Sequence, residues 1–280
     1  MAALRTCFVG GGKMAEAMVR GGIAASANVS VDVVDPNPNR AGVFEALGGA
    51  VFGSVPAAFE KSGAHDVVIL AVKPQTFEAV AAELRSALAP GQLVLSIMAG
   101  IPLAALAEKL GHAHVVRAMP NTPAAIGAGM TVWTAGASLG AAHAGVAAEL
   151  LGAFGKQLRA EREDYLDMAT ALSGTGPAYY FIAMEAMVDA GVHMGLPRDM
   201  ARTMVEQTML GAVQYGQATG QHPAVLRNDI TSPGGTTAAA MYTAERGNFR
   251  TVIADAVWAA YRKSVAMGGG EAVRHPGSLS

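Results

Sequence analysis

The chain has 280 residues, of which 51% are hydrophobic and 15% charged, with a mean hydropathy of +0.31. This composition excludes intrinsic disorder, and the length predicts two domains with a sizeable core. Lys and Arg number 20 against 22 acidic residues, a net charge of −2, so no global basic field attracts nucleic acid or a membrane. We therefore expect the partner to be a small molecule or another copy of the chain, and we expect neither nucleic acid nor membrane.

The sequence offers little for disulfide, metal or membrane chemistry. A single cysteine, Cys7, excludes an intrachain disulfide and a cysteine-cluster metal site, and in an apolar strand it is expected to be inert. His112 and His114 are interpreted as a solvated loop feature, and no metal is expected. The charge-free stretches 86–107 and 118–148 are interrupted by prolines and glycines, unlike spanning helices. Because no signal-peptide layout opens the chain, we expect a cytoplasmic protein.

Residues 4–160 alternate short β-branched runs with alanine-rich helical segments, which is typical of a parallel sheet covered on both faces. We expect strands at Thr6–Val9, Val29–Val34, Val67–Ala71, Leu93–Ile97, Val115–Ala118 and Thr131–Thr134. Helices are expected at Met14–Ala25, Asn37–Leu47, Val55–Lys61, Thr76–Ala87, Leu103–Leu110 and Ala141–Phe154. The pattern predicts an α/β, doubly wound domain over residues 1–160.

After about residue 161 the strand pattern stops. We expect helices at Asp164–Leu172, Ala178–Met194, Arg198–Thr219, Ala224–Asp229, Thr236–Arg246 and Phe249–Met267. In the second of these, only Glu185 and Asp189 are charged and apolar residues occur all round, so the helix belongs in a core or a subunit interface. The sequence thus predicts an all-helical domain over residues 161–267 and a disordered tail over 268–280.

A glycine-rich turn follows the first expected strand. Gly10-Gly11-Gly12-Lys13-Met14-Ala15 fits G-x-G-x-x-A in a strand–turn–helix context. Gly10 would allow the tight turn, Gly12 would let the backbone approach a pyrophosphate at the helix N-terminus, and Ala15 would permit close packing. The context favours a Rossmann-type dinucleotide site over a flexible connector.

Asp35 lies 25 residues after Gly10, at the end of the second expected strand. An acidic residue there accepts hydrogen bonds from a ribose 2′-OH and repels a 2′-phosphate, which favours NADH. Arg40, and less so Asn37 and Asn39, could still contact a 2′-phosphate. The alternative is that Asp35 only caps the turn that follows.

Two further loops follow the ends of strands, where open α/β sheets bind ligands. Ala71-Val72-Lys73-Pro74 is either a cofactor loop or an ordinary exposed turn. Arg117-Ala118-Met119-Pro120-Asn121-Thr122-Pro123 is stiffened by prolines, and the amide of Asn121 suits a nicotinamide or its ribose. A structural Asx turn is the alternative for Asn121.

Two segments stand out in the helical half. Leu172–Tyr179 precedes the apolar helix, and Asp229–Thr237 places two glycines and four hydroxyls immediately before or at a helix start. Backbone N–H groups in the second segment could bind a carboxylate, although helix capping alone would explain either segment. No G-x-S-x-G motif and no paired carboxylates indicate another catalytic centre.

The sequence resembles the pyrroline-5-carboxylate reductase family from Thr6 to about Met267. The matching motifs are Phe8-Val9-Gly10-Gly11-Gly12, Ala71-Val72-Lys73-Pro74, Arg117–Pro123, Ser173–Tyr179, Met194-Gly195-Leu196-Pro197-Arg198 and His222-Pro223 running on to Ser232-Pro233-Gly234-Gly235-Thr236-Thr237. The resemblance implies a Rossmann domain followed by a helical dimerisation domain, in a homodimer or a ring of dimers.

The resemblance also implies site residues. Gly10–Ala15 and Ala71–Pro74 would hold the dinucleotide, with Ser54 and Asn121 as weaker candidates for ribose and nicotinamide contacts. The backbone of Ser232, Gly234, Gly235 and Thr236 would bind the substrate carboxylate. Thr237 would hydrogen-bond the ring nitrogen, and with Ser232 it is our candidate for the catalytic set.

Two residues depart from the family pattern, because Lys13 replaces the usual asparagine and Asp35 replaces a residue more favourable to a 2′-phosphate. The cofactor is thus expected to be NADPH, the family's usual choice, with NADH left open by Asp35.

The implied reaction is the reduction of the cyclic imine 1-pyrroline-5-carboxylate to L-proline, the last step of proline biosynthesis. A β-hydroxyacid dehydrogenase is a rival interpretation, but it would need a catalytic lysine and residues 170–194 contain none. A non-catalytic dinucleotide-binding regulator is a second rival, which a fold alone never excludes.

Overall fold

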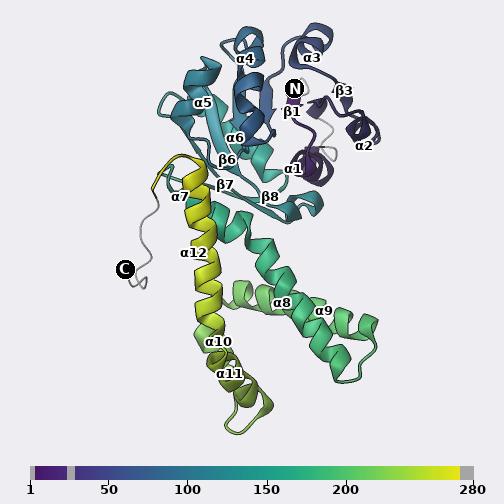
Figure 1. Cartoon of the computed structure of the whole chain (residues 1–280), viewed down its shortest axis with the longest axis vertical. Coiled ribbons are helices and arrows are strands. Elements are labelled where there is room, and N and C mark those ends of the chain that lie inside the picture. The colour runs from purple at the N-terminus through teal and green to yellow at the C-terminus, as the bar shows by residue number, and fades with distance from the viewer. Residues whose placement is uncertain (1–3, 24–28, 272–280) are drawn as a thin grey trace. The chain divides into compact units, whose positions relative to one another are not determined.

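The computed structural model describes residues 4–23 and 29–271, which form two compact units. The first contains the described residues up to Pro177 and from Trp258 onward, and the second is Ala178–Val257. The boundaries fall inside helices α8 and α12 (Figure 1).

The first unit is built on an eight-stranded sheet with the order β3-β2-β1-β4-β5-β6-β7-β8 (Figure 1). The strands are β1 (Leu4–Val9), β2 (Val29–Val34), β3 (Ala50–Phe52), β4 (Val67–Leu70), β5 (Leu93–Ser96), β6 (Val115–Met119), β7 (Gly129–Ala135) and β8 (Gly155–Arg159). All neighbouring pairs are parallel except β6 and β7. Because every residue of β4 and β5 is buried, their apolar sequences suit the centre of the sheet.

Helices cover both faces of this sheet (Figure 1). They are α1 (Lys13–Met18), α2 (Ala41–Glu45), α3 (Val55–Ser62), α4 (Phe77–Ala87), α5 (Leu103–Leu110), α6 (Ala141–Gly152) and α7 (Tyr165–Ala169). Shorter helical turns lie at Val19–Ile23, Pro38–Arg40, Pro74–Thr76, Thr122–Ile126 and Thr170–Gly174. Phe8 packs in one core, while Cys7 and Val9 pack in the other. This alternation along β1 confirms the predicted doubly wound sheet.

The expected strands all form, but β3 and β8 were not predicted. β3 has only three residues, which is too short for an alternating pattern to show. β8 carries Lys156, Gln157 and Arg159 and lies at an edge, so its polar sequence hid it. The sheet is therefore mostly rather than fully parallel, since β7 and β8 run opposite to the other strands.

The second unit consists of helices. α8 (Gly176–His193) enters it, followed by α9 (Arg198–Thr219), α10 (Pro223–Asp229), α11 (Thr236–Arg246) and α12 (Phe249–Met267), which leaves it. The core within the unit is small, with Val188, Ala201 and Val205 as its buried residues. Tyr180, Phe181 and Ile182 of α8 are exposed. The unit thus leaves most of its large apolar side chains uncovered by its own chain.

The break expected near residue 161 lies inside the first compact unit. Arg117 of β6 pairs with Glu163 and Asp167, and Ser264 of α12 donates to Asp167 at 2.8 Å. These bonds join α7 and the end of α12 to the sheet. Of the expected tail 268–280, Gly268 and Gly269 form a turn directly after α12, in which the N–H of Gly268 donates to the oxygen of Val265 at 3.0 Å. Residues 272–280 lie outside the described residues.

Within residues 4–23 and 29–271, no helix is both long and apolar enough to cross a membrane.

Candidate active site

The glycine-rich turn joins β1 to α1 in a conformation that needs glycine. Gly10 has φ +103°, and a Cβ atom there would lie 2.7 Å from the backbone carbonyl carbon of Ala71. Its N–H donates to the oxygen of Val34 at 2.8 Å, which fixes the turn against β2. Gly12 caps α1 and is exposed, so a ligand can reach the N–H groups of the first helical turn.

A cavity of about 410 Å³ opens beside this turn at the carboxyl ends of β1, β2 and β4. Its walls include Gly10, Asp35, Ser54, Ala71 and Lys73. These belong to four separate segments that the sequence had singled out, and the fold brings them together. The volume, the helix N-terminus and the missing Cβ atoms fit the phosphate and ribose part of a dinucleotide.

Lys73 and Ser54, both in the cavity wall, differ in their hydrogen bonds to the rest of the protein. Lys73 is exposed, with no bond from its ammonium group to another described residue. The Ser54 hydroxyl accepts from the N–H of Ala57 at 3.4 Å and so caps α3. Ser54 therefore has a structural function in addition to the ribose contact we predict.

Asp35 lies in the cavity wall with its carboxylate held by backbone groups. Oδ2 accepts the N–H of Gly11 at 2.8 Å, and Oδ1 accepts the N–H of Asn37 at 2.9 Å. The second bond is the turn-capping interaction that the sequence left as an alternative. The first ties β2 to the phosphate-binding turn. Both fix the carboxylate at the position where an acid would meet a ribose 2′-OH.

Arg40 and Glu16 form a charged pair on the outer side of the same turn. Arg40 Nε donates to the oxygen of Gly11 at 2.6 Å, and Nη2 donates to Glu16 Oε2 at 2.8 Å. Arg20 Nε donates to the other oxygen of Glu16 at 3.0 Å. The hydrogen bond from Arg40, helped by Arg20 and by the charge of Lys13, lowers the pKa of Glu16 to about 2. Glu16 is therefore ionised at neutral pH.

Asn121 is buried in the loop after β6, with both ends of its amide engaged. Nδ2 donates to the oxygen of Ser173 at 3.0 Å, and Oδ1 accepts the N–H of Met130 at 2.9 Å. These bonds join the loop to β7 and to the turn before α8. The geometry favours a structural function for Asn121, while its contact with the nicotinamide stays a prediction.

In the second unit, Ser232–Thr237 forms a turn that opens α11. Gly234 has φ +72°, and the N–H of Gly235 donates to the oxygen of Ser232 at 3.1 Å. Within the described residues, the N–H groups of Gly234, Thr236 and Thr237 have no hydrogen-bond acceptor. The Thr237 hydroxyl, half-buried, has no partner there either. Free N–H groups at a helix start make a site for an anion such as a carboxylate.

Other singled-out groups have structural functions. In the segment before α8, the Ser173 hydroxyl donates to the backbone oxygen of Ala169 at 3.0 Å, and the Thr175 hydroxyl donates to that of Thr170 at 2.9 Å.

The interpretation of His112 as a solvated loop feature was wrong, because the ring is buried and Nε2 lies 2.7 Å from the oxygen of Gln92. In the described part of the chain, no group of three potential ligands is placed to hold a metal ion.

Cys7 is buried in β1, as expected for an inert thiol. Burial, with a smaller contribution from the charge of Asp32, raises the pKa of Cys7 to about 12. The thiolate needed for nucleophilic attack is therefore absent near neutral pH.

Sequence reasoning missed the contact of Glu16 with Arg40 beside the glycine-rich turn. Its i, i+4 spacing to Arg20 was visible as an ordinary surface pair. Its pairing with Arg40, 24 positions away, depends on how β2 and the following turn pack beside α1. No local pattern could have shown that contact.

Two family models match the chain. One is described as pyrroline-5-carboxylate reductase dimerisation and matches residues 163–267. The other is described as NADP oxidoreductase, coenzyme F420-dependent, and matches residues 5–100. The first covers the helical half and the second covers the turn and cavity described above.

Whole proteins are similar over nearly the full length. A pyrroline-5-carboxylate reductase of Arabidopsis thaliana is 43% identical over 92% of this chain and 93% of that protein. One of Pseudomonas aeruginosa is 39% identical over 94% of this chain and 97% of that protein. The crystal structure of a Plasmodium falciparum pyrroline carboxylate reductase with NADP bound has a TM-score of 0.85 at 29% identity, covering 96% of this chain and 99% of that one.

Proposed function

The chain belongs to the pyrroline-5-carboxylate reductase family, and we propose that it reduces 1-pyrroline-5-carboxylate to L-proline with NADPH or NADH, the last step of proline biosynthesis. The observation that carries the assignment of sites is the pair of anion-binding helix starts, one beside the glycine-rich turn and one at Ser232–Thr237. A dinucleotide and a cyclic carboxylate need one each.

The cofactor is assigned to the cavity beside Gly10–Ala15, with Lys73 and Ser54 in its wall. The turn leaves room for a pyrophosphate, Lys73 can add a positive charge, and Asp35 faces the ribose position. When bound, the cofactor supplies the hydride that reduces the imine carbon. The remaining work of binding, orienting and excluding water belongs to the protein.

The substrate carboxylate is assigned to the backbone N–H groups at the start of α11. The free N–H groups of Gly234, Thr236 and Thr237 support this assignment, since each can donate to an anion without breaking an internal bond. The Thr237 hydroxyl then accepts a hydrogen bond from the ring N–H of the iminium. Ser232, whose oxygen holds Gly235, maintains the turn and is the weaker catalytic candidate.

No side chain in this arrangement is required as a strong acid. An iminium accepts hydride better than a neutral imine does, and its nitrogen can take the proton from water before binding. The protein then has to hold the carboxylate and the ring nitrogen at fixed points, which orients the imine carbon toward the nicotinamide. This requirement matches a segment rich in N–H and hydroxyl groups and poor in titratable ones.

An assay with two substrates tests the proposal. Oxidation of NADPH and of NADH, followed by absorbance, should depend on added 1-pyrroline-5-carboxylate. The matched substrate 1-pyrroline has the same imine without the carboxylate, so its kcat/KM should be lower by about 10-fold or more, the size of a lost charge-assisted hydrogen bond. Cofactor binding without turnover would instead indicate a non-catalytic regulator.

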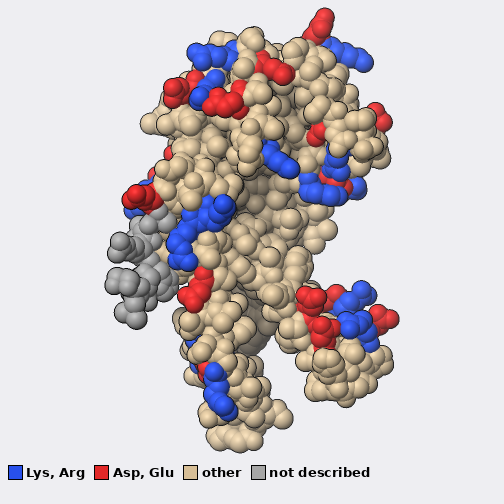
Figure 2. All heavy atoms as spheres, in the orientation of Figure 1, with Lys and Arg blue, Asp and Glu red and all other residues tan. Residues whose placement is uncertain are grey.

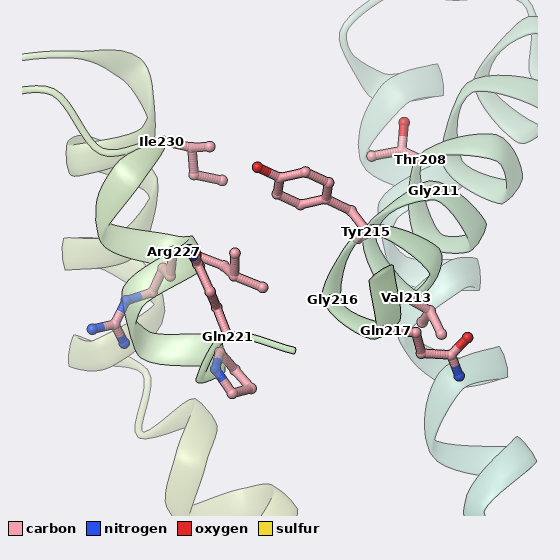
Figure 3. A pocket seen from close by; sticks show the side chains of 12 residues that line it. Thr208, Gly211, Val213, Tyr215, Gly216, Gln217, Gln221, Arg227 and Ile230 are labelled. Atoms are coloured by element: carbon pink, nitrogen blue, oxygen red, sulfur yellow. The ribbon is translucent and has the colours of Figure 1, made fainter. Parts of the chain in front are cut away.

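We further propose a homodimer or a ring of dimers, assembled through the helical unit. Tyr180, Phe181 and Ile182 of α8 are 60–65% exposed in the single chain. A largely apolar groove of about 750 Å³ lies between the end of α9 and α10, where Tyr215 points toward Ile230 (Figure 3). Figure 2 shows broad uncharged areas on these helices. Another copy is the partner that covers such surfaces in a soluble oligomer.

We propose residues 1–160 as the dinucleotide-binding domain and 161–267 as the substrate-binding and dimerisation domain. This division is supported by the family model, which starts at residue 163.

We also propose a cytoplasmic location. It is supported by a single, buried cysteine, which is typical of proteins from reducing compartments.

A further inference from the structure

Gly11 connects two residues of opposite charge at the cofactor site. Its N–H donates to Asp35 at 2.8 Å, and its carbonyl oxygen accepts from Arg40 Nε at 2.6 Å. Gly11 is buried, and a Cβ atom there would lie 3.1 Å from the Asp35 carboxylate. Arg40 and Asp35, the acid that faces the ribose 2′ position, are therefore both bonded to the same residue. A guanidinium at such a place is the group that accommodates a 2′-phosphate in NADP-binding sites.

In this chain, two of the three guanidinium nitrogens of Arg40 already donate hydrogen bonds within the protein. Nε is bonded to Gly11 and Nη2 to Glu16, while the plane of the guanidinium group lies near the ring of Phe44, 5.4 Å from Cζ to the ring centroid. The side chains of Arg40 and Glu16 are only 18% and 14% exposed. Figure 2 shows basic and acidic atoms in contact over the region of α1 and α2. The guanidinium is thus fixed and its charge is balanced by Glu16.

We propose that Glu16 is a specificity-determining residue: by holding Arg40 against the glycine-rich turn, it withholds the guanidinium from a 2′-phosphate and weakens NADPH binding relative to NADH. The inference rests on the proposed function only in requiring that the site bind a nicotinamide dinucleotide. Glu16 does not touch the cofactor in this account, and it acts through Arg40. Because the carboxyl of Glu16 has a pKa near 2, the restraint is present throughout the neutral range.

The first test measures binding rather than turnover. Dissociation constants of NADPH and NADH are measured from nucleotide fluorescence for wild type and Glu16→Gln, a change that keeps shape and removes the charge. We expect the NADPH constant to fall about 2- to 5-fold, the range for a partly exposed charge interaction, while the NADH constant stays within about 2-fold. Glu60→Gln is the matched control, because Glu60 is an exposed glutamate of α3 outside the cavity; it should change neither constant.

A double-mutant cycle then shows whether the effect passes through Arg40. In an Arg40→Gln background, Glu16→Gln should leave the NADPH-to-NADH ratio unchanged. An equal shift in both backgrounds would mean that Glu16 acts directly on the phosphate and would overturn the proposal, as would an unchanged ratio in the single variant. A wild-type protein that binds neither nucleotide would instead contradict the proposed function itself. The two failures are therefore distinguishable in one set of measurements.

Discussion

Arg117 and Asp167 form a buried ion pair that joins the sheet to α7, with 3.0 Å between Nη2 and Oδ1. The Arg117 side chain is 2% exposed, and its other terminal nitrogen, Nη1, lies 3.1 Å from Glu163. Ser264 of α12 donates to the same oxygen of Asp167. Arg117 therefore connects β6 with α7 and, through Asp167, with the end of α12, all within the first compact unit.

Because breaking a buried pair leaves an uncompensated charge, Asp167→Asn should destabilise the protein by about 3 kcal/mol. Urea unfolding at one protein concentration measures this as a lower midpoint with an unchanged slope. Asp189→Asn is the control, since Asp189 pairs with Arg198 on the surface and should lose less than about 1 kcal/mol. Equal losses in the two variants would contradict the structural function of the Arg117 cluster.

Replacements at Thr237 separate orientation from acid catalysis. Thr237→Ser keeps the hydroxyl and should keep most activity, whereas Thr237→Val leaves the ring N–H unpaired and should lower kcat/KM roughly 10- to 200-fold. Thr243→Val makes the same change later in α11, where the hydroxyl bonds to Ala239, and should have little effect. Cofactor binding should stay nearly unchanged in all three.

The pH profile completes this test. If the proton comes from solvent, Thr237→Val adds no new ionisation to the dependence of kcat/KM on pH. A loss that worsens steeply as the pH rises would show that the hydroxyl donates the proton. Near-wild-type turnover by Thr237→Val would remove the residue from the site.

Replacing Asp35 should move cofactor preference toward NADPH. Asp35→Ser removes a negative charge from the ribose 2′ position, and we expect the ratio of kcat/KM for NADPH to that for NADH to rise about 10-fold. The N–H of Gly11 also loses its acceptor, so KM should rise for both cofactors. Asp66→Asn is a matched control, because Asp66 accepts a backbone N–H from Arg5 away from the cavity. An unchanged ratio would mean that Asp35 only caps the turn.

The exposed apolar face of α8 should hold the oligomer together. Ile182 is 65% exposed in the single chain, so Ile182→Lys would place a charge in the proposed interface and shift the protein toward the 28.5 kDa chain. Light scattering at dilute concentration measures this. Leu158→Lys replaces a residue that is 61% exposed on β8 and should leave assembly unchanged. A stable wild-type monomer would contradict the proposal.

Acid should weaken the contribution of Glu16 to stability. Its pKa is lowered from 4.5 to about 2 in the folded chain, chiefly by the hydrogen bond from Arg40. A lowered folded pKa means that the stabilisation is present above about pH 4.5 and is lost as the pH falls toward about 2. The unfolding free energies of wild type and Glu16→Gln, about 1 kcal/mol apart at neutral pH, should converge only as the pH falls toward about 2. A constant difference would show that the bond to Arg40 does not depend on charge.

Local signals placed most of the fold correctly. α9 runs over Arg198–Thr219 as predicted, because Pro197 precedes it and Gly220, with φ +63°, ends it. The central strands were visible as apolar runs. β8 was not predicted, because an edge strand needs no apolar face. α7 was assigned to the helical half, because its pairing with Arg117 spans 50 positions and no local pattern shows it.

In the candidate site too, the sequence predicted the features that depend on local structure and not those that depend on tertiary contacts. Gly10 was predictable, since a tight turn between a strand and a helix requires a residue that tolerates positive φ. The partners of Asn121 and His112 depend on tertiary contacts, so their structural functions were hidden in the sequence. The charge balance between Arg40 and Glu16 was hidden for the same reason.

The most direct test of the account is the fate of a deuterium label. The enzyme is supplied with 1-pyrroline-5-carboxylate and nicotinamide cofactor that carries deuterium at C4 on the transferred face, and the product is examined by mass spectrometry and NMR. Hydride transfer to the imine carbon predicts L-proline with one deuterium at its δ-carbon. Cofactor binding that yields no proline, or proline without the label at that carbon, would contradict the assignment of this chain as an imine reductase.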